Sequence, residues 1–169
     1  MGETVTDRAA EARATYLRYV ESREAVGRGE RTWASLGEEF FTEDAVFVDP
    51  AWGRVEGRVA IAEFMDESMA GLDDWSFPEA WTMVEDDRVV AMWWNRLPET
   101  RGDGTPHQAM GLSVLHYAGD GRFSYEHDVL NMAHVLELIT ESGWAPPATM
   151  NVPPARPDRD PTPPRRSGP

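Results

Sequence analysis

The sequence contains no cysteine, so disulfide bonds and thiolate chemistry are excluded. It has no apolar run long enough to span a membrane, and its first residues lack the basic and apolar regions of a signal peptide. Basic residues are scarce: the 16 Lys and Arg are outnumbered by 30 Asp and Glu, which gives a net charge of -14. Such a surface repels nucleic-acid phosphates and anionic lipids. We therefore expect a cytoplasmic protein with neither nucleic-acid nor membrane partners.

The composition changes near the end of the chain. The 169 residues are 41% apolar, enough for one globular domain with a core. Nine of the thirteen prolines fall in residues 146–169, where aliphatic side chains are nearly absent. Such a segment cannot offset its ordering entropy by burying apolar surface. We therefore predict a domain over residues 1–145 and a disordered or polyproline-like tail over 146–169, for which a docking-peptide role is a second interpretation.

Hydrophobic periodicity predicts helices early in the chain and strands later. A long first helix ends at the glycines of 27–29, and a last helix covers residues 132–142, with Asn131 as its cap and Gly143 at its close. This order is typical of an α+β protein whose sheet curls around its first helices. The expected elements between the first and last helices are helices at 31–41 and 59–70 and strands at 45–49, 75–84, 88–97, 107–117 and 122–130.

The segment 40–65 carries a specific pattern. Its strand is stopped by Pro50, which cannot donate to a sheet ladder, so Asp49 is left at the rim of an apolar layer. The segment resembles the SnoaL-like and ketosteroid isomerase-like branches of the nuclear transport factor 2-like superfamily. That resemblance implies a cone-shaped α+β barrel, with three N-terminal helices packed on a curved, mixed, mostly antiparallel sheet and a C-terminal helix. The residues that carry it are Phe41, Asp44, Ala45, Asp49, Pro50, Gly57, Ala60, Ile61 and Phe64.

Strand alternation gives two faces to the sheet, and both are rich in apolar or aromatic side chains. Helices and a cavity cover one face, and we expect a second copy to cover the other, because large exposed apolar patches are rare on monomers. We therefore predict a homodimer. The resemblance implies that Val90, Met92, Trp94, Ser113, Leu115, Glu126, Asp128 and Leu130 line the cone, and that Trp93, Met110, Leu112, Val114, Phe123, Tyr125 and Val129 face outward.

Several candidate catalytic residues follow from the resemblance. Asp49 matches the catalytic base of the isomerases, and a carboxylate at an apolar rim should have a raised pKa. The alternative is an aspartate that caps its own turn. Tyr19 resembles the tyrosine that donates to the oxyanion, with Tyr16 one turn earlier on the same face. Ser113 departs from the isomerases, which place an aspartic acid there, so steroid isomerisation is not expected.

Glu126 and Asp128 are two residues apart on one predicted strand, so both lie on one face. Two buried carboxylates repel, and one should keep a proton or pair with Arg96 on the same sheet. This mixture of acid, base and cation suits cyclisation, dehydration, isomerisation or the addition of water. A purely structural network of arginine and carboxylates is the alternative.

The four histidines show no metal-ligand spacing, and we expect no metal and no cofactor. We interpret the chain as a small enzyme performing acid–base chemistry on a hydrophobic small molecule in an apolar cavity. The alternative is a non-catalytic small-molecule-binding or accessory protein of the same fold. The expected catalytic residues are Asp49, Asp128, Tyr19, Tyr16, Glu126 and Arg96, and those expected to contact the ligand are Trp94, Met92, Phe64, Trp52, Trp81, Ser113 and Leu130.

Overall fold

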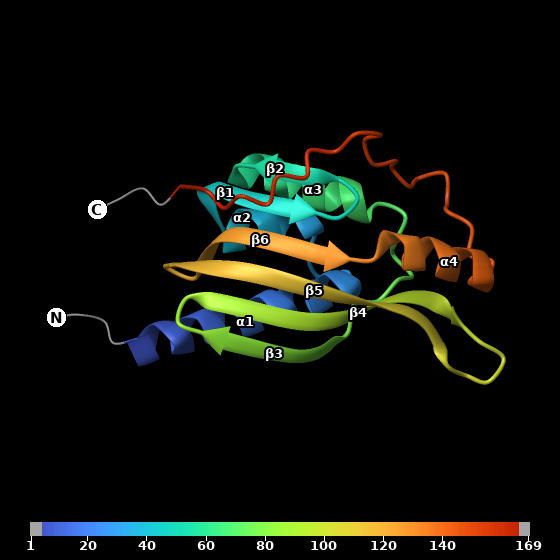
Figure 1. Ribbon diagram of the computed structural model, residues 1–169, viewed down its shortest axis with the longest axis horizontal. Coiled ribbons are helices and arrows are strands. Elements are labelled where there is room, and N and C mark those ends of the chain that lie inside the picture. The colour runs from blue at the N-terminus through green and yellow to red at the C-terminus, as the bar shows by residue number, and fades with distance from the viewer. Residues whose placement is uncertain (1–4, 166–169) are drawn as a thin grey trace.

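A computed structural model describes residues 5–165, and its helices and strands confirm the predicted α+β class (Figure 1). No helix of this described part is long and apolar enough to cross a membrane. In chain order the elements are α1 (Val5–Gly27), α2 (Trp33–Phe40), β1 (Phe41–Asp49), β2 (Gly53–Glu56), α3 (Arg58–Met69), β3 (Glu79–Glu85), β4 (Arg88–Thr100), β5 (Pro106–Gly119), β6 (Arg122–Leu130) and α4 (Met132–Ser142).

The strands form one mixed sheet in the order β2-β1-β6-β5-β4-β3. Only the β1–β6 contact is parallel, and all other neighbours are antiparallel, as predicted. The sheet is open, with β2 and β3 as its two edges, so it is a curved sheet and not a closed barrel. The parallel pair places the end of β1 beside the last strand, which brings Asp49 and Asp128 to the same region.

The beginning of the chain differs from prediction in one respect. Two helices precede β1, and the third, α3, follows a strand that we expected to be a loop. That strand is β2, which forms a tight hairpin with β1 through the pairs Val48 with Arg54 and Asp49 with Gly53. The two glycines around it suggested a loop, but Gly53 is needed for its positive φ of 84° at the start of the strand.

Helices cover one face of the sheet, which we call the inner face. α1 runs behind the strands in Figure 1, and α2 and α3 lie behind β1 and β2. α1 contacts β3, β4 and β5, whereas α2 and α3 contact β1. The main core fills the space between these helices and the sheet. Its largest fully buried side chains include Tyr16, Tyr19, Phe40, Phe41, Phe123, Leu36, Ile61, Leu115 and Val89.

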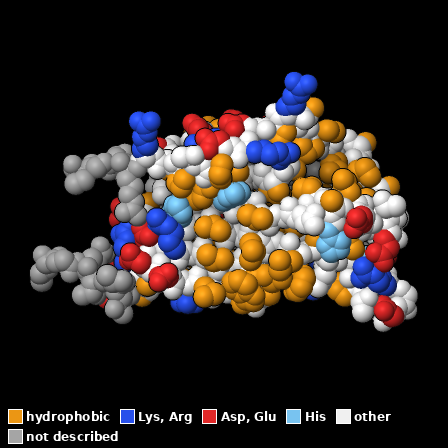
Figure 2. Space-filling model, viewed as in Figure 1, with side chains coloured by type: hydrophobic (Ala, Val, Ile, Leu, Met, Phe, Trp, Pro, Cys, Tyr) orange, Lys and Arg blue, Asp and Glu red, His pale blue; other side chains and the backbone are white. Residues whose placement is uncertain are grey.

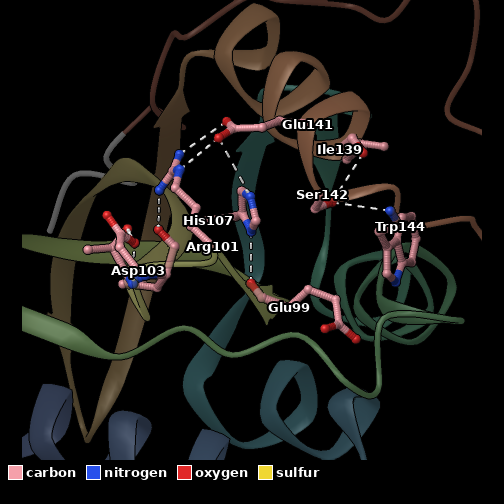
Figure 3. Close-up of polar contacts among 10 residues, drawn as sticks. Glu99, Arg101, Asp103, His107, Ile139, Glu141, Ser142 and Trp144 are labelled. Atoms are coloured by element: carbon pink, nitrogen blue, oxygen red, sulfur yellow. Dashed lines mark hydrogen bonds and ion pairs between the residues drawn. The ribbon is translucent and has the colours of Figure 1, made fainter.

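The last helix, α4, packs on the far ends of β4 and β5 (Figure 3). Arg101, in the loop between these strands, makes a two-pronged contact with Glu141 of α4, at 2.7 Å from Nε to Oε1 and 3.1 Å from Nη2 to Oε2. The ring of His107 bonds through Nδ1 to the backbone oxygen of Glu99 at 2.9 Å. Because a carbonyl oxygen only accepts, that nitrogen carries the proton. These contacts are structural, and His107 lies outside the acidic site described below.

The proline-rich tail folds back onto the domain as far as it is described, up to residue 165. It is extended, without helix or strand, and crosses in front of β1 and β2 in Figure 1. The backbone N–H of Arg54 donates to the oxygen of Asp158 at 2.7 Å, and Tyr125 Oη donates to the oxygen of Pro161 at 2.5 Å. We had expected a disordered or polyproline-like tail. These hydrogen bonds hold the segment against the domain, which composition alone cannot reveal.

Candidate functional site

The register of the sheet decides which side chains reach the interior. Ser113 on β5 pairs with Asp128 on β6, and Leu115 pairs with Glu126, so these four side chains share one face of the sheet, as predicted. On the other side, Ala91 of β4 pairs with Ser113, which turns Ala91 inward together with Trp93. The structure therefore places the polar side chains of Ser113, Glu126 and Asp128 on the inner face, where apolar side chains border them.

The predicted face of β4 was wrong by one residue. Met92, Trp94 and Arg96 point to the outer face, as does Trp81, which pairs with Met92. Arg96 is bonded to its neighbour Gln108 there, at 2.8 Å from Nε to Oε1. These residues cannot act with the inner acids. Both faces of β4 are apolar, so nothing in its own sequence reveals its orientation, and a shift of one residue exchanges the two sets.

Three more residues on the sheet were assigned to the wrong face, and one assigned contact is displaced. Trp93 and Phe123 face the interior, the latter because the pairing of β5 with β6 shifts near Tyr117. Leu130 packs beneath α4 against a separate small core and not beside the acids. Val90, which pairs with Val114 on the opposite side from Ala91, also faces outward.

Asp128 sits at the end of a hydrogen-bonded chain that starts at an indole. Trp93 Nε1 donates to Ser113 Oγ at 3.0 Å, and Ser113 Oγ donates to Asp128 Oδ1 at 2.5 Å. An indole N–H can only donate, so the serine oxygen must accept from it and point its own proton at the carboxylate. Ser113 is 2% exposed, so this arrangement is shielded from water. Ser113, which stands where the isomerases have an aspartic acid, thus donates a hydrogen bond directly to Asp128.

Burial raises the pKa of Asp128 to about 7. The hydrogen bond from Ser113 acts against this rise, while the negative charge of Asp49 adds to it. A carboxyl group with this pKa exists in both protonation states near neutral pH. That is the property required of a group that both accepts and returns a proton.

Glu126 is the most deeply buried carboxyl of the site, with 2% of its surface exposed. Burial and then the charge of Asp128 raise its pKa well above the ordinary value. Its side chain also forms hydrogen bonds with Tyr19 and Asp128. Its second oxygen, Oε2, is buried and has no hydrogen-bond partner among the described residues. Burial thus favours the protonated form of the Glu126 carboxyl group.

The two candidate tyrosines face the interior from α1, as expected, but their hydroxyl groups are already bonded. Tyr16 Oη donates to Glu79 Oε2 at 2.8 Å, and Tyr19 donates to Glu126. Burial raises the pKa of both tyrosines, so neither ionises readily. Glu79, at the start of β3, was not predicted as a site residue. Its only sequence signal is an acidic residue at the start of a strand.

Asp49 caps its own turn, which was one of the two interpretations of this residue, and its charge also reaches Asp128. Its Oδ1 accepts hydrogen bonds from the backbone N–H groups of Ala51 at 2.8 Å and Trp52 at 2.7 Å, so it caps the β1–β2 turn. Burial nevertheless raises its pKa, and its charge acts on Asp128. Trp52 and Phe64 lie together beside this turn, with ring centroids 6.3 Å apart. They form the apolar side of the site.

Arg23 is the cation of the site, in the place predicted for Arg96. It follows Tyr16 and Tyr19 on one face of α1, and its Cζ lies 5.4 Å from the centroid of the Tyr19 ring. Its charge acts on Glu126 and Asp128. The spacing of seven residues from Tyr16 was a usable signal, because residues at i, i+3 or i+4 and i+7 share one face of a helix.

Two surface hollows of the described residues lie away from these acids. One, with a volume of about 470 Å³, is lined by the start of α3 together with Glu43 and Glu56. Another, of about 460 Å³, lies along the exposed side of α4. Neither hollow is the apolar cavity that we expected to contain the acids. Within residues 5–165, no three His, Asp or Glu side chains are arranged to hold a metal ion.

Comparison with known proteins agrees with this fold. A family model described as a SnoaL-like domain matches residues 16–126. No curated protein matches the chain by sequence. Among solved structures, a protein named as a SnoaL-like polyketide cyclase from Jannaschia sp. CCS1 has a TM-score of 0.63 at 18% identity, over 86% of this chain and 100% of that one.

Two further solved structures share the fold. An epoxide hydrolase of the LEH-like type from M. tuberculosis has a TM-score of 0.56 at 15% identity, over 79% of this chain and 92% of that one. A protein with a ketosteroid isomerase-like fold from Catenulispora acidiphila also has a TM-score of 0.56, at 18% identity, over 76% of this chain and 97% of that one. At these identities the likeness concerns the fold, which several activities can share.

Proposed function

Since the chain belongs to the SnoaL-like domain family, we propose that it is a cofactor-independent enzyme that moves protons on a hydrophobic small molecule. The observation that carries this proposal is the neighbouring pair Glu126 and Asp128. Burial raises the pKa of both groups, that of Asp128 to about 7. A carboxyl group whose pKa lies near neutrality, as that of Asp128 does, is suited to general acid–base catalysis in an apolar surrounding. Cyclisation, isomerisation, dehydration and hydration all use such a step.

The two acids have different roles in this proposal. Glu126 is fully enclosed and keeps its proton, while Asp128 is half-buried and can meet a ligand. Asp128 therefore accepts the proton of the substrate, and the hydrogen bond from Ser113 steadies the anion before the step. Asp49 is the second carboxylate, and it adjusts the proton affinity of Asp128 by its charge. Trp52 and Phe64 offer apolar contact to the substrate on the Asp49 side.

Hydrogen exchange on a simple ketone tests this proposal without knowledge of the natural substrate. The probe is 2-tetralone in deuterium oxide, and proton NMR follows the loss of its signals next to the carbonyl group. We expect the protein to accelerate exchange, and Asp128→Asn to slow it by roughly 10²- to 10⁴-fold. Asp74→Asn, at an exposed aspartate, is the control and should have no effect. Failure of the unaltered protein to exceed buffer contradicts the proposal.

The alternative of a non-catalytic binding protein gives a different result in the same experiment. Such a protein binds 2-tetralone, as judged by broadening of the ligand signals, but does not accelerate exchange. In that case Asp128→Asn leaves the binding unchanged. The buried acids then serve the fold alone.

We also propose that a second copy of the chain covers part of the outer face. Large apolar side chains remain exposed there, including Met83 at 67% and Met110 at 54%. Figure 2 shows hydrophobic side chains gathered over the lower half of this face, where β3, β4 and β5 lie. An apolar patch of this kind on a protein of net charge -14 supports a self-complementary contact, in which the patch is buried against its own copy.

A further inference from the structure

The turn between β1 and β2 lies between the acidic site and the C-terminal tail. On the inner side, Oδ1 of Asp49 accepts the backbone N–H groups of Ala51 at 2.8 Å and Trp52 at 2.7 Å. The ring of Trp52 packs against Phe64, with centroids 6.3 Å apart. On the outer side, the tail crosses the same hairpin in front of β1 and β2 (Figure 1). The conformation of this turn can therefore depend on the tail as well as on the site.

The tail contacts both ends of the turn. Nη1 of Arg159 donates to the backbone oxygen of Pro50 at 2.9 Å. The backbone oxygen of Asp158 accepts from the backbone N–H of Arg54 at 2.7 Å. A Cβ at Gly53 would overlap that oxygen of Asp158, so the tail lies directly on the glycine. The turn is thus held from outside at its first residues and again where β2 begins.

The tail is also fixed beyond the turn, so it can serve as a firm support. Nη1 of Arg54 donates to the backbone oxygens of Asp160 at 3.1 Å and Thr162 at 2.6 Å. Tyr125 donates from Oη to the backbone oxygen of Pro161 at 2.5 Å. The side chain of Tyr125 lies on the outer face, yet the residue is only 4% exposed. This part of the tail cannot move along the hairpin without breaking several hydrogen bonds.

Arg159 differs from its neighbours in the way it contacts the domain. Asp158, Asp160, Pro161 and Thr162 accept hydrogen bonds from the domain through their backbone oxygens, which a residue of any type provides. Arg159 instead donates from its side chain. A substitution at Arg159 therefore removes the contact with the turn and leaves the backbone contacts of the tail available.

We propose that Arg159 is a positioning residue of the acidic site, which holds the turn at Pro50 and thereby keeps Asp49 and Trp52 in place for a ligand. This inference rests on the proposed function, in which Trp52 offers apolar contact and Asp49 acts by its charge. It makes the tail a part of the site, although the family match ends at residue 126. Contact groups that are already fixed need not be ordered when the ligand binds.

Amide hydrogen exchange of the full-length protein, followed by NMR, tests the physical link without turnover. The reporters are the backbone N–H groups of Ala51 and Trp52, which donate to Asp49. Arg159→Met removes the donors and the charge but keeps most of the stem of the side chain. We expect protection of both reporters to fall by about threefold to tenfold, because local opening of the turn becomes easier. Amides in the centre of β5 should keep their protection.

Two further variants separate positioning from a general effect of charge. Arg159→Lys keeps a donor and a positive charge, so it should restore most of the protection. Arg156→Met, at another exposed arginine of the tail, removes the same charge and should leave both reporters unchanged. Unchanged protection of Ala51 and Trp52 in Arg159→Met overturns the inference, as does an equal loss in Arg156→Met.

The same variants are then compared in the exchange of 2-tetralone at a series of concentrations. We expect Arg159→Met to raise KM by about threefold to tenfold and to change kcat by less than about twofold, because Trp52 contacts the bound ligand equally before and during the step. Arg159→Lys should recover the KM of the unaltered protein. A fall in kcat at constant KM, or no change in either, overturns the role of Arg159 and leaves the proposed function standing. Failure of the unaltered protein to exchange 2-tetralone contradicts the proposed function itself, and protection of the two amides still decides whether Arg159 holds the turn.

Discussion

Trp93 and Asp128 are joined through a single serine hydroxyl whose direction the indole determines. Trp93 Nε1 lies 3.0 Å from Ser113 Oγ, which in turn lies 2.5 Å from Asp128 Oδ1. The oxygen that accepts from the indole has its own proton left for the carboxylate. A residue that need not touch the substrate thus helps to set the proton affinity of the proposed base.

Trp93→Phe should therefore raise the pKa of Asp128. The substitution keeps an aromatic ring but removes the N–H, so the Ser113 hydroxyl loses its fixed direction and donates less strongly to the anion. We expect a rise of about half a unit to one unit, because a neutral hydrogen bond contributes about 1 kcal/mol. Carboxyl carbon NMR across a pH series measures it. Trp94→Phe, on the outer face, is the control, and equal effects of the two changes would contradict the relay.

The stability of the protein should fall as pH rises through the acidic range. Asp128 keeps its proton up to about pH 7 in the folded state, whereas its ordinary value is 3.8. Between these values the folded state binds more protons than the unfolded state, so the contribution of Asp128 to the free energy of unfolding decreases as pH rises and levels off above about 7. Asp128→Asn removes this part of the slope in urea unfolding at a series of pH values. A smaller slope should remain, because burial also raises the pKa of Asp49 and Glu126. An unchanged slope would show that Asp128 is not raised.

Gly111→Ala should disturb the relay through packing alone. A Cβ at this position would lie 2.5–2.7 Å from ring atoms of Trp93, which covers the glycine from the neighbouring strand. The ring is held by Phe77 on its other side, at 6.0 Å between centroids, so it has little freedom to move. We expect a loss of about 1–3 kcal/mol in stability, measured by denaturant unfolding. At Gly102 an added Cβ meets nothing within 4 Å, so Gly102→Ala should be tolerated.

Arg54→Met should release the tail from the domain. The Arg54 side chain donates to the backbone oxygens of Thr162 at 2.6 Å and Asp160 at 3.1 Å. We expect the variant to lose protection of residues 157–162 in hydrogen–deuterium exchange, and about 1–3 kcal/mol in stability. Arg58→Met, which removes only a surface contact with Glu43, is the control. Unchanged exchange of the tail would mean that other contacts suffice to hold it.

Met110→Glu should keep the chain monomeric. A carboxylate in the proposed contact would have to be desolvated against its copy, which is strongly unfavourable. Sedimentation velocity of the unaltered chain should show a dimer, and the variant a monomer with unchanged circular dichroism. Leu17→Glu, at an exposed apolar residue of α1, is the control. A monomeric unaltered chain refutes the proposed interface.

Much of the fold could be predicted because its signals are local. The last strand and last helix were placed at 122–130 and 132–142, since Asn131 and Gly143 mark the two ends of the helix and a turn with Gly119 and Gly121 marks the start of the strand. Simple alternation placed Asp128 and Glu126 on one face, and the family resemblance made that face the inner one. Family resemblance supplied the arrangement of helices and sheet, which local patterns do not contain.

The rest depends on contacts that no local pattern reveals. The pairing of β4 with β5 decides which of its side chains face inward. Because both faces of this strand are apolar, its sequence pattern cannot tell the inner face from the outer one. This is why Arg96 was placed in the site and Arg23 was not. Trp93 was likewise assigned to the wrong face. The partners of Tyr16 and Tyr19 lie 63 and 107 positions further along the chain, so their use could be known only from the structure.

The folded-back tail also has a consequence for how the protein behaves at high concentration. β2 is an edge of the sheet, and the N–H of Arg54 on that edge is already taken by Asp158. An unpaired edge invites strands from other molecules to add to it, while proline residues cannot extend such a ladder. The tail thus blocks the addition of strands from other molecules at this edge. A chain shortened before residue 157 should therefore aggregate more readily, even if its interior is intact.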